Sequence, residues 1–265
     1  IQVGRADFPA YMVGTETDNR RAQSSRRVLR DLRDLTLEDF SAAVLTTRLI
    51  AADEWLDDLF QAVQERVASD REGAALLEGP VAALRDWDRI STAASVPTTL
   101  FVLWAEAVNP DRNRSRDRWV EGLAQVVRVL EADWGTWEVP WGETNRIQRP
   151  DAAGLTPFDD ALPSLPVAGA PGALGSVFTF HSASIEEGRR RYGQHGNSFV
   201  KVVEFTPTVR GRSVFVFGQS GDPDSPHYFD QAQVYSASSF KEAWFTREDV
   251  EARTERRYQL TFQGR

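Results

Sequence analysis

The spacing of the apolar residues changes once along this sequence, and that change limits the fold more than any other feature. Over residues 18–135 apolar side chains recur at helical spacing, as Trp55, Leu59 and Val63 do, which is typical of amphipathic helices. From residue 175 onward the period becomes two, which is typical of strands. The sequence therefore predicts an α+β fold in which a helical block is followed by a β-rich layer.

Three regions follow from this change. Residues 1–135 are the predicted helical region, in which Thr36 and Asp39 have the spacing of a capping box. Residues 136–174 are rich in proline and glycine, and we interpret them as an ordered connecting loop, because loops of this length are usually packed or functional. Residues 175–265 are the β-rich part. We expect the three regions to form one interlocked domain.

Three segments of the β-rich part have distinct patterns. Phe199–Phe205 and Val214–Phe217 are apolar at nearly every position, which predicts strands covered on both faces. Residues 258–263 alternate between apolar and polar side chains, which predicts a half-exposed strand near a sheet edge. Thr246 and Asp249 predict the start of a short helix by the capping pattern.

Charge and composition exclude several classes of protein. The formal net charge is −8, whereas proteins that bind nucleic acid nonspecifically are usually basic, so we expect no nucleic-acid partner. No apolar run approaches the roughly 18 residues of a membrane span. The absence of cysteine excludes disulfide scaffolds, thiolate zinc sites and cysteine nucleophiles from this chain.

Neither the histidines nor the longest arginine run predicts a ligand site. His181, His195 and His227 lack the spacing of a metal motif, so we interpret them as loop or hydrogen-bonding residues. We interpret Arg189–Arg191 as a solvated face, because the chain as a whole is acidic. The residues themselves predict no cofactor and no metal.

A cluster of tryptophans leaves two interpretations open. Trp134, Trp137 and Trp141 lie within eight residues of one another, beside Glu138 and Glu143. If the rings are exposed, they are suited to stacking on sugars in a carbohydrate-binding module, with the carboxylates as acid and base. If they are buried, they hold the long loop against the helical block.

Several sequence motifs occur in a fixed order along the chain. The motifs are Asp7-Phe8-Pro9, Asn19–Leu29, Pro140–Arg146, Phe158–Pro166, Phe217–Pro223, Ser225-Pro226-His227-Tyr228 with Asp230-Gln231, and Ala243–Val250. In this order they resemble the penicillin acylase family, most closely its aculeacin A and acyl-homoserine-lactone acylases. The resemblance is clear over about residues 7–40 and 136–256 and weak over the helices between.

This resemblance implies a fold, a reaction and partners. The family consists of N-terminal-nucleophile hydrolases with an αββα sandwich, formed when a precursor cleaves itself into a small and a large subunit. The serine that begins the large subunit, with its own α-amine as base, attacks the amide of an N-acyl compound such as a β-lactam, a lipopeptide or an acyl-homoserine lactone.

By the same resemblance, this chain corresponds to the C-terminal part of the large subunit. Residue 1 is Ile, which has no nucleophilic atom, so the serine and the oxyanion asparagine are expected upstream. We therefore expect the chain alone to be inactive. We also expect its partners to be the small subunit, the missing part of the large subunit and an N-acyl amide substrate, and its location to be the periplasm or the medium.

One functional residue of the family maps onto this sequence. The spacing of Arg21 from residues 27–29 matches the family arginine that supports the oxyanion site. The alternative is that Arg21 only forms a salt bridge at a helix start. Some members hold a structural calcium ion, for which Asp7, Glu16 and Asp18 are the nearest carboxylates, although none matches the family position.

Overall fold

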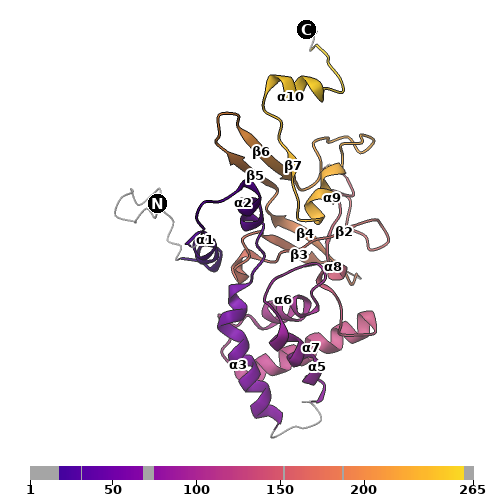
Figure 1. Cartoon of the computed structure of the whole chain (residues 1–265). Helices are drawn as coiled ribbons and strands as arrows, with labels where there is room; N and C mark the ends of the chain where they lie inside the picture. Colours follow the sequence, from indigo (N-terminus) through magenta and orange to yellow (C-terminus); the bar gives the residue numbers. More distant parts are fainter. Residues whose placement is uncertain (1–17, 31, 68–74, 152, 187, 260–265) are drawn as a thin grey trace, which may run out of the picture.

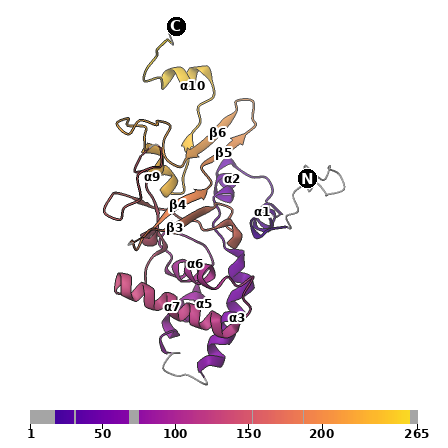
Figure 2. The same ribbon diagram turned by 180° about the vertical axis from the view of Figure 1, so that it is seen from behind.

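The computed structural model describes residues 18–30, 32–67, 75–151, 153–186 and 188–259. These residues form an elongated molecule with helices at one end and two sheets toward the other (Figure 1). Seen from behind, the helical block again lies at the end opposite the last helix (Figure 2). The predicted mixture of a helical part and a β-rich part is therefore present.

The first half of the chain is helical, as its apolar period predicts. The helices are α1 (Arg20–Arg30), α2 (Leu37–Val44), α3 (Ile50–Val67), α5 (Glu78–Asp86), α6 (Val96–Val108), α7 (Arg116–Trp134) and the short α8 (Trp141–Thr144). Helix α6 begins at the N-cap Ser95, whose side chain accepts from the Thr98 amide, and ends at Asn109 in a left-handed conformation. Phe101 and Trp104 on α6 are fully buried, which makes this helix the centre of the block.

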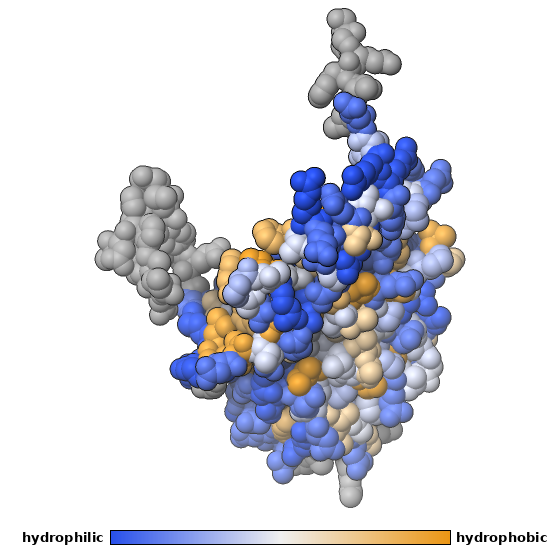
Figure 3. All heavy atoms as spheres, turned by 45° about the horizontal axis from the view of Figure 1, so that its top comes forward, coloured by the Kyte–Doolittle hydropathy of each residue, from blue (hydrophilic) through white to orange (hydrophobic). Residues whose placement is uncertain are grey.

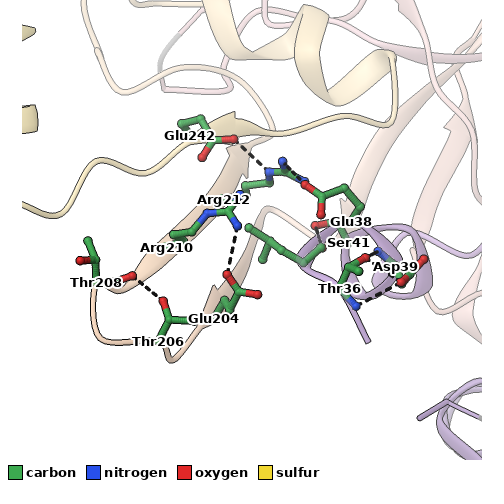
Figure 4. A network of polar contacts seen from close by, with 11 residues as sticks. Thr36, Glu38, Asp39, Ser41, Glu204, Thr206, Thr208, Arg210, Arg212 and Glu242 are labelled. Carbon is green, nitrogen blue, oxygen red and sulfur yellow. Dashed lines mark hydrogen bonds and ion pairs between the residues drawn. The ribbon is translucent and has the colours of Figure 1, made fainter. Parts of the chain in front are cut away.

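Helix α2 departs from the predicted single helical block. The capping box is confirmed, since the Thr36 side chain accepts from the Asp39 amide and the Asp39 side chain accepts from the Thr36 amide. The helix, however, packs against strand β5 of the C-terminal sheet. Its Glu38 accepts from Arg212 at 2.7 Å, while Glu242 accepts from the same guanidinium at 3.0 Å (Figure 4). The described residues before Gly135 therefore pack both within the helical block and against the C-terminal sheet.

The strands form two sheets. The first has the order β2-β1-β4-β3, with β1 (Asn145–Ile147), β2 (Leu165–Pro166), β3 (Phe180–Ser184) and β4 (Arg191–Gly196); β1 and β4 are parallel and the other pairs antiparallel. The second has the order β5-β6-β7, with β5 (Phe199–Glu204), β6 (Arg210–Phe215) and β7 (Lys241–Glu242). The remaining elements are the 3-10 turn η2 (Gly172–Leu174), α9 (Asp230–Ser236) and α10 (Arg247–Ala252).

The proline- and glycine-rich region is more than a connecting loop. It supplies α8 and both β1 and β2, so the first sheet is built from residues on either side of the expected boundary at 174/175. Sequence periodicity missed these strands because each is only two or three residues long. The predicted three-way division therefore does not coincide with the sheets.

Two strand predictions need correction. Phe199 is 57% exposed and Phe205, just after β5, is 88% exposed, so β5 is not covered on both faces. Tyr258 is 75% exposed and lies outside any strand, and residues 260–263 of that predicted strand are outside the described residues. On the face shown in Figure 3, apolar patches interrupt a largely hydrophilic surface. The predicted helix start at Thr246 is confirmed.

Candidate functional site

Arg21, the one mapped functional residue, lies in the first turn of α1. Its Nε and Nη2 atoms donate to the carbonyl oxygen of Val177 at 3.2 and 3.1 Å, and Nη2 also donates to Oδ1 of Asn197 at 3.4 Å. The same Asn197 oxygen accepts from the Thr179 amide at 2.8 Å. Arg21 therefore joins the start of the described chain to the segments that enter β3 and leave β4.

The neighbouring Arg20 faces the helical block. Its guanidinium donates to both carboxylate oxygens of Asp111, each at 2.7 Å, and to Glu54 at 2.8 and 2.9 Å. It also lies 4.5 Å from the ring centroid of Trp55. The hydrogen bond to Asp111 and the other contacts with the two carboxylates raise the pKa of Arg20, and Arg20 in turn lowers the pKa of Asp111. Consecutive arginines thus hold α1 to two different parts of the fold.

The described residues do not fit a calcium site here. The carboxylate of Asp18 is ion-paired with Arg26, and Asp7 and Glu16 lie outside the described residues. Over the described part of the chain, no group of three or more His, Asp or Glu side chains could hold a metal ion. A calcium site, which needs several oxygen ligands, is therefore not formed by the residues described near α1.

Arg149 is a central residue that the sequence reasoning missed. Its Nη1 donates to the carbonyl oxygens of Tyr228 at 2.6 Å and Ser220 at 3.0 Å, and its guanidinium lies 4.1 Å from the Tyr228 ring centroid. Its partners are backbone carbonyls more than 70 residues away in sequence, so no local pattern could have indicated this role. We call Arg149, Phe217, Ser220 and Tyr228 the Arg149 cluster.

The C-terminal motifs are explained by packing around the Arg149 cluster. A Cβ atom on Gly218 would lie 2.2 Å from the carbonyl oxygen of His227, so only glycine fits there. A hydrogen bond of 3.0 Å joins His227 Nδ1 to a carboxylate oxygen of Asp230, and this bond raises the pKa of His227. Gln231 accepts from the Phe215 amide at 3.2 Å. The G-Q-S-G and S-P-H-Y motifs therefore form a structural turn that connects β6 to α9.

The arginine run 189–191 is a solvated face only at Arg189, because Arg190 and Arg191 are half-buried. Arg191 donates to Glu106 on α6 at 2.6 Å, with only 11% of its side chain exposed. Arg190 donates to the carbonyl oxygen of Asp160 at 2.8 Å, and Arg189 lies over the Trp134 ring at 4.5 Å. The prediction was wrong for Arg190 and Arg191, because their charged ends reach partners on the 158–166 segment and on helix α6.

In the tryptophan cluster Trp141 is buried, and Trp134 and Trp137 are partly buried against the helical core. Trp141 is fully buried and donates from Nε1 to the Gly169 carbonyl oxygen at 2.7 Å. Trp137 packs against Gly79 on α5, and Trp134 is half-buried below Arg189. Both Glu138 and Glu143 are exposed. These rings hold the proline-rich region against the helical block, and the geometry does not provide the flat exposed surface that sugar stacking needs.

The histidines belong to no metal-ligating group within the described part of the chain. His181 and His195 face each other across β3 and β4, with stacked rings 4.4 Å apart at their centroids. Burial and the neighbouring His195 lower the pKa of His181. Among the hydrogen bonds between described residues, no hydroxyl group is bonded to an imidazole nitrogen, so no serine–histidine pair is present there.

The chain matches one protein family over nearly its whole length. The family model described as Penicillin amidase matches residues 2–252. An "Acyl-homoserine lactone acylase PvdQ" from Pseudomonas fluorescens is 24% identical over 97% of this chain, and one from Pseudomonas syringae pv. syringae is 23% identical over 82%. This chain spans 33% and 29% of their respective lengths.

A solved structure with a partial likeness is the thermostable penicillin G acylase from Alcaligenes faecalis. It superimposes with a TM-score of 0.47 and 13% identity, over 92% of this chain and 53% of that chain. None of the helices in the described part of the chain is long and apolar enough to cross a membrane. From the match across residues 2–252, the chain belongs to the penicillin amidase family.

Proposed function

We propose that this chain is the C-terminal part of the large subunit of an acylase that hydrolyses the amide bond of an N-acyl compound. The observation that carries the proposal is the family match over residues 2–252, in a chain that spans about a third of its curated relatives. The relatives named above are acyl-homoserine lactone acylases, and the substrate class we assign is an N-acyl amide of that kind, a lipopeptide or a β-lactam.

The proposed reaction uses a serine outside this chain, at the start of the large subunit. Its Oγ attacks the amide carbonyl carbon while its own α-amine takes the proton, and the protonated amine product leaves. Water then hydrolyses the resulting ester and releases the acid.

In this proposal, the described residues build a scaffold, and Arg21 is a positioning residue. Its guanidinium is held by Val177 and Asn197 at the start of α1, close to the first described residue. An arginine has several directed donors and a permanent charge. We propose that it orders the group that donates to the oxyanion and takes no part in proton transfer.

The test is to express the complete reading frame that contains this sequence, with the 265-residue chain as a control. The proposal requires an in-frame Gly-Ser junction upstream, two subunits after maturation, and release of acid from N-acyl-homoserine lactone or penicillin G. Replacement of the junction serine by alanine abolishes both the processing and the release. The 265-residue chain alone releases no acid. Turnover by that chain alone, lost on a point change within it, contradicts the proposal.

The location and the partners belong to the same proposal. We propose that the enzyme is exported to the periplasm or the medium and that its small subunit completes the fold. The complete reading frame should then begin with a signal peptide, and activity should appear in the periplasmic fraction or the medium. Activity confined to the cytoplasm would contradict the assigned location while leaving the proposed reaction intact.

A further inference from the structure

The last described part of the chain leaves the body of the molecule as an arm. We call residues 243–259 the C-terminal arm, which follows β7 and contains α10. It joins the three-stranded sheet through the amide of Ala243, which donates to the carbonyl oxygen of Gly211 at 2.8 Å. Beyond that point α10 stands away from the sheets and the helical block in both views (Figure 1 and Figure 2). None of the residues of α10 is buried.

The polar contacts of α10 stay within the C-terminal arm. Thr246 and Asp249 bond each other, Arg247 donates to Glu251 and Arg253 donates to Asp249. These contacts join residues only three or four positions apart. Within the described part of the chain, no hydrogen bond or ion pair connects a residue of α10 to the body of the molecule. The helix is therefore not held in place by its own polar groups.

A helix as short as α10 needs a surface to pack on. It has six residues, whereas isolated helices shorter than about 12–15 residues are marginal in water. The cap at Thr246 offsets only part of this cost, because it satisfies one of the free amides of the first turn. Most of the stability of protein helices comes from packing of an apolar face. The structure of α10 therefore indicates a partner surface.

The C-terminal arm presents apolar side chains that suit such a partner. Phe245 precedes the N-cap Thr246 and Val250 is the fourth residue of α10, which are the two positions of a hydrophobic staple and lie on the same side of the helix start. Phe245 is 69% exposed and Val250 is 50% exposed. The Arg253 guanidinium lies 3.4 Å from the ring centroid of Trp244, which folds the two ends of the helix region together.

The exposed aromatic side chains of the described residues all lie in the C-terminal part of the chain. They are Phe199, Phe205, Trp244, Phe245 and Tyr258. Aromatic rings of the described helical block are at least partly buried. Single exposed apolar residues are ordinary, whereas several on one part of a molecule indicate an interaction surface. Three of the five rings belong to the C-terminal arm.

The comparisons and the charges of the C-terminal arm indicate what covers it. The family match runs over residues 2–252 and so includes all of α10, while the chain spans only 33% and 29% of its curated relatives. Residues 244–258 contain four arginines and four carboxylates. A helix that lies on a membrane surface is usually rich in basic residues on its polar face, so this balance favours a protein partner.

We propose that the C-terminal arm docks, through Phe245 and Val250, on the part of the enzyme that precedes residue 1. The inference rests on the proposed function, which assigns this chain to the end of a longer acylase. Docking removes the two apolar side chains from water and gives α10 the packing that a six-residue helix lacks. The arm is then a structural connection and takes no part in hydrolysis.

Photocrosslinking in the complete, matured protein tests the contact directly. The photoreactive residue p-benzoyl-phenylalanine is placed at position 245 or 250, or at position 248 as the matched control. Glu248 is exposed and lies on the opposite side of the helix from Val250, because two residues turn a helix by about 200°. We expect irradiation to link positions 245 and 250 to peptides that precede residue 1, with several-fold lower yield from position 248.

Proteolysis of the same complete protein gives a second measurement. Phe245→Ser and Val250→Ser remove the proposed apolar contacts, and Glu248→Ser is the control. Loss of one buried large apolar side chain favours the undocked arm about tenfold or more, and proteolysis follows the population of the open form. Trypsin should therefore cleave after the arginines of the arm about tenfold faster in the two variants, whereas the control and the turnover number should change little.

Three results would overturn the inference. One is that positions 245 and 250 link only to residues within this chain, or to nothing. Another is that they link to a second copy, which a mixture of isotopically labelled and unlabelled protein reveals. The third is equal yield from all three positions together with unchanged cleavage of the variants. Release of acid is measured separately, so upstream links in a protein that releases no acid would refute the proposed reaction and leave the docking intact.

Discussion

Arg20 and Asp111 form a bidentate ion pair, in which Nη1 and Nη2 of Arg20 each donate to a different carboxylate oxygen of Asp111 at 2.7 Å. Asp111 lies in the connection between α6 and α7, so the pair fastens α1 to the helical block. The same guanidinium donates to Glu54 on α3 and lies over Trp55. The orientation of α1, and with it the position of Arg21 one residue later, depends on this contact.

Replacing Arg20 by lysine should loosen α1. An ammonium group cannot reproduce the two parallel hydrogen bonds or the stacking on Trp55. Because Asp111 and Glu54 are partly solvated, the loss is smaller than for a buried pair, about 1–2 kcal/mol in the free energy of unfolding. Urea titration measures the change. Arg247→Lys, on an arginine whose side chain is 90% exposed, is the matched control and should change stability little.

Arg21 should affect turnover in the complete acylase rather than substrate affinity. Arg21→Lys keeps the charge but loses the directed bonds to Val177 and Asn197. Loss of an oxyanion donor itself typically costs about 10²–10³ in kcat, so a positioning residue should cost about tenfold to a hundredfold with little change in KM. Arg27→Lys on the same helix is the control. Wild-type kcat in both Arg21→Lys and Arg21→Ala would show that Arg21 is only a surface helix residue.

The His181–His195 pair should make the fold less stable in acid. Burial and the neighbouring His195 and Arg191 lower the pKa of His181, against the opposing effect of Glu106. The unfolded state, with an ordinary histidine pKa of about 6.5, then takes up the proton first. Stability is therefore full above that pH and falls as the pH drops through it toward the lower folded pKa. Unfolding in urea at several pH values should show this slope, and His181→Gln should reduce it.

His227 supplies a control of opposite sign. Its hydrogen bond to Asp230 raises the pKa of His227, so the folded state holds the proton more tightly than the unfolded state. This stabilisation is present below the ordinary histidine pKa and is lost as the pH rises through the folded value. His227→Gln should therefore lower stability on the acidic side only. If both histidine variants shift the profile in the same direction, the assignment of the two environments is wrong.

The exposed apolar residues in and just after β5 should make the isolated chain associate. Phe199 is 57% exposed and Phe205 is 88% exposed, beside the outer edge of the three-stranded sheet. Exposed apolar surface and an unpaired strand edge both favour association. The chain should bind a hydrophobic dye and sediment as more than a monomer, and Phe205→Ser should reduce both signals. A monomer that binds no dye and melts reversibly would favour a self-contained domain.

Trp141 should matter for stability and not for carbohydrate binding. Trp141→Phe removes the hydrogen bond to the Gly169 carbonyl oxygen and leaves space in a fully buried site. The expected cost is about 2–4 kcal/mol in the free energy of unfolding, whereas Trp134→Phe, at a half-buried site, should cost clearly less. Titration with soluble polysaccharides should leave tryptophan fluorescence unchanged. Saturable quenching that Trp134→Phe removes would restore the carbohydrate interpretation.

Local features of this protein were predictable from the sequence because they depend on neighbouring residues. The capping pair Thr36 and Asp39 and the pair Thr246 and Asp249 both start helices as their spacing predicts. A cap involves backbone and side-chain groups only three residues apart. The order of C-terminal motifs was likewise sufficient to indicate the family that the match over residues 2–252 shows.

Only the tertiary structure decided what the long polar side chains do. Arg149 bonds carbonyl oxygens of Ser220 and Tyr228, and Arg191 reaches Glu106 on α6. A backbone carbonyl has the same chemistry at every position, so the sequence does not indicate which carbonyl oxygen an arginine side chain will bind. The short strands β1 and β2 were hidden for a related reason, since two or three residues are too few to show a period.

The sequence by itself thus determined where α2 and α10 begin, that helices dominate before Gly135 and strands β3 to β7 follow, and the family to which the chain belongs. The packing of α2 against β5, the exposure of Phe205 and the burial of Tyr235 were decided by the tertiary structure. The physical reason is the separation along the chain over which each kind of interaction acts. Propensity and capping act over a few residues, whereas burial and partner choice depend on segments that folding brings together from distant parts of the chain.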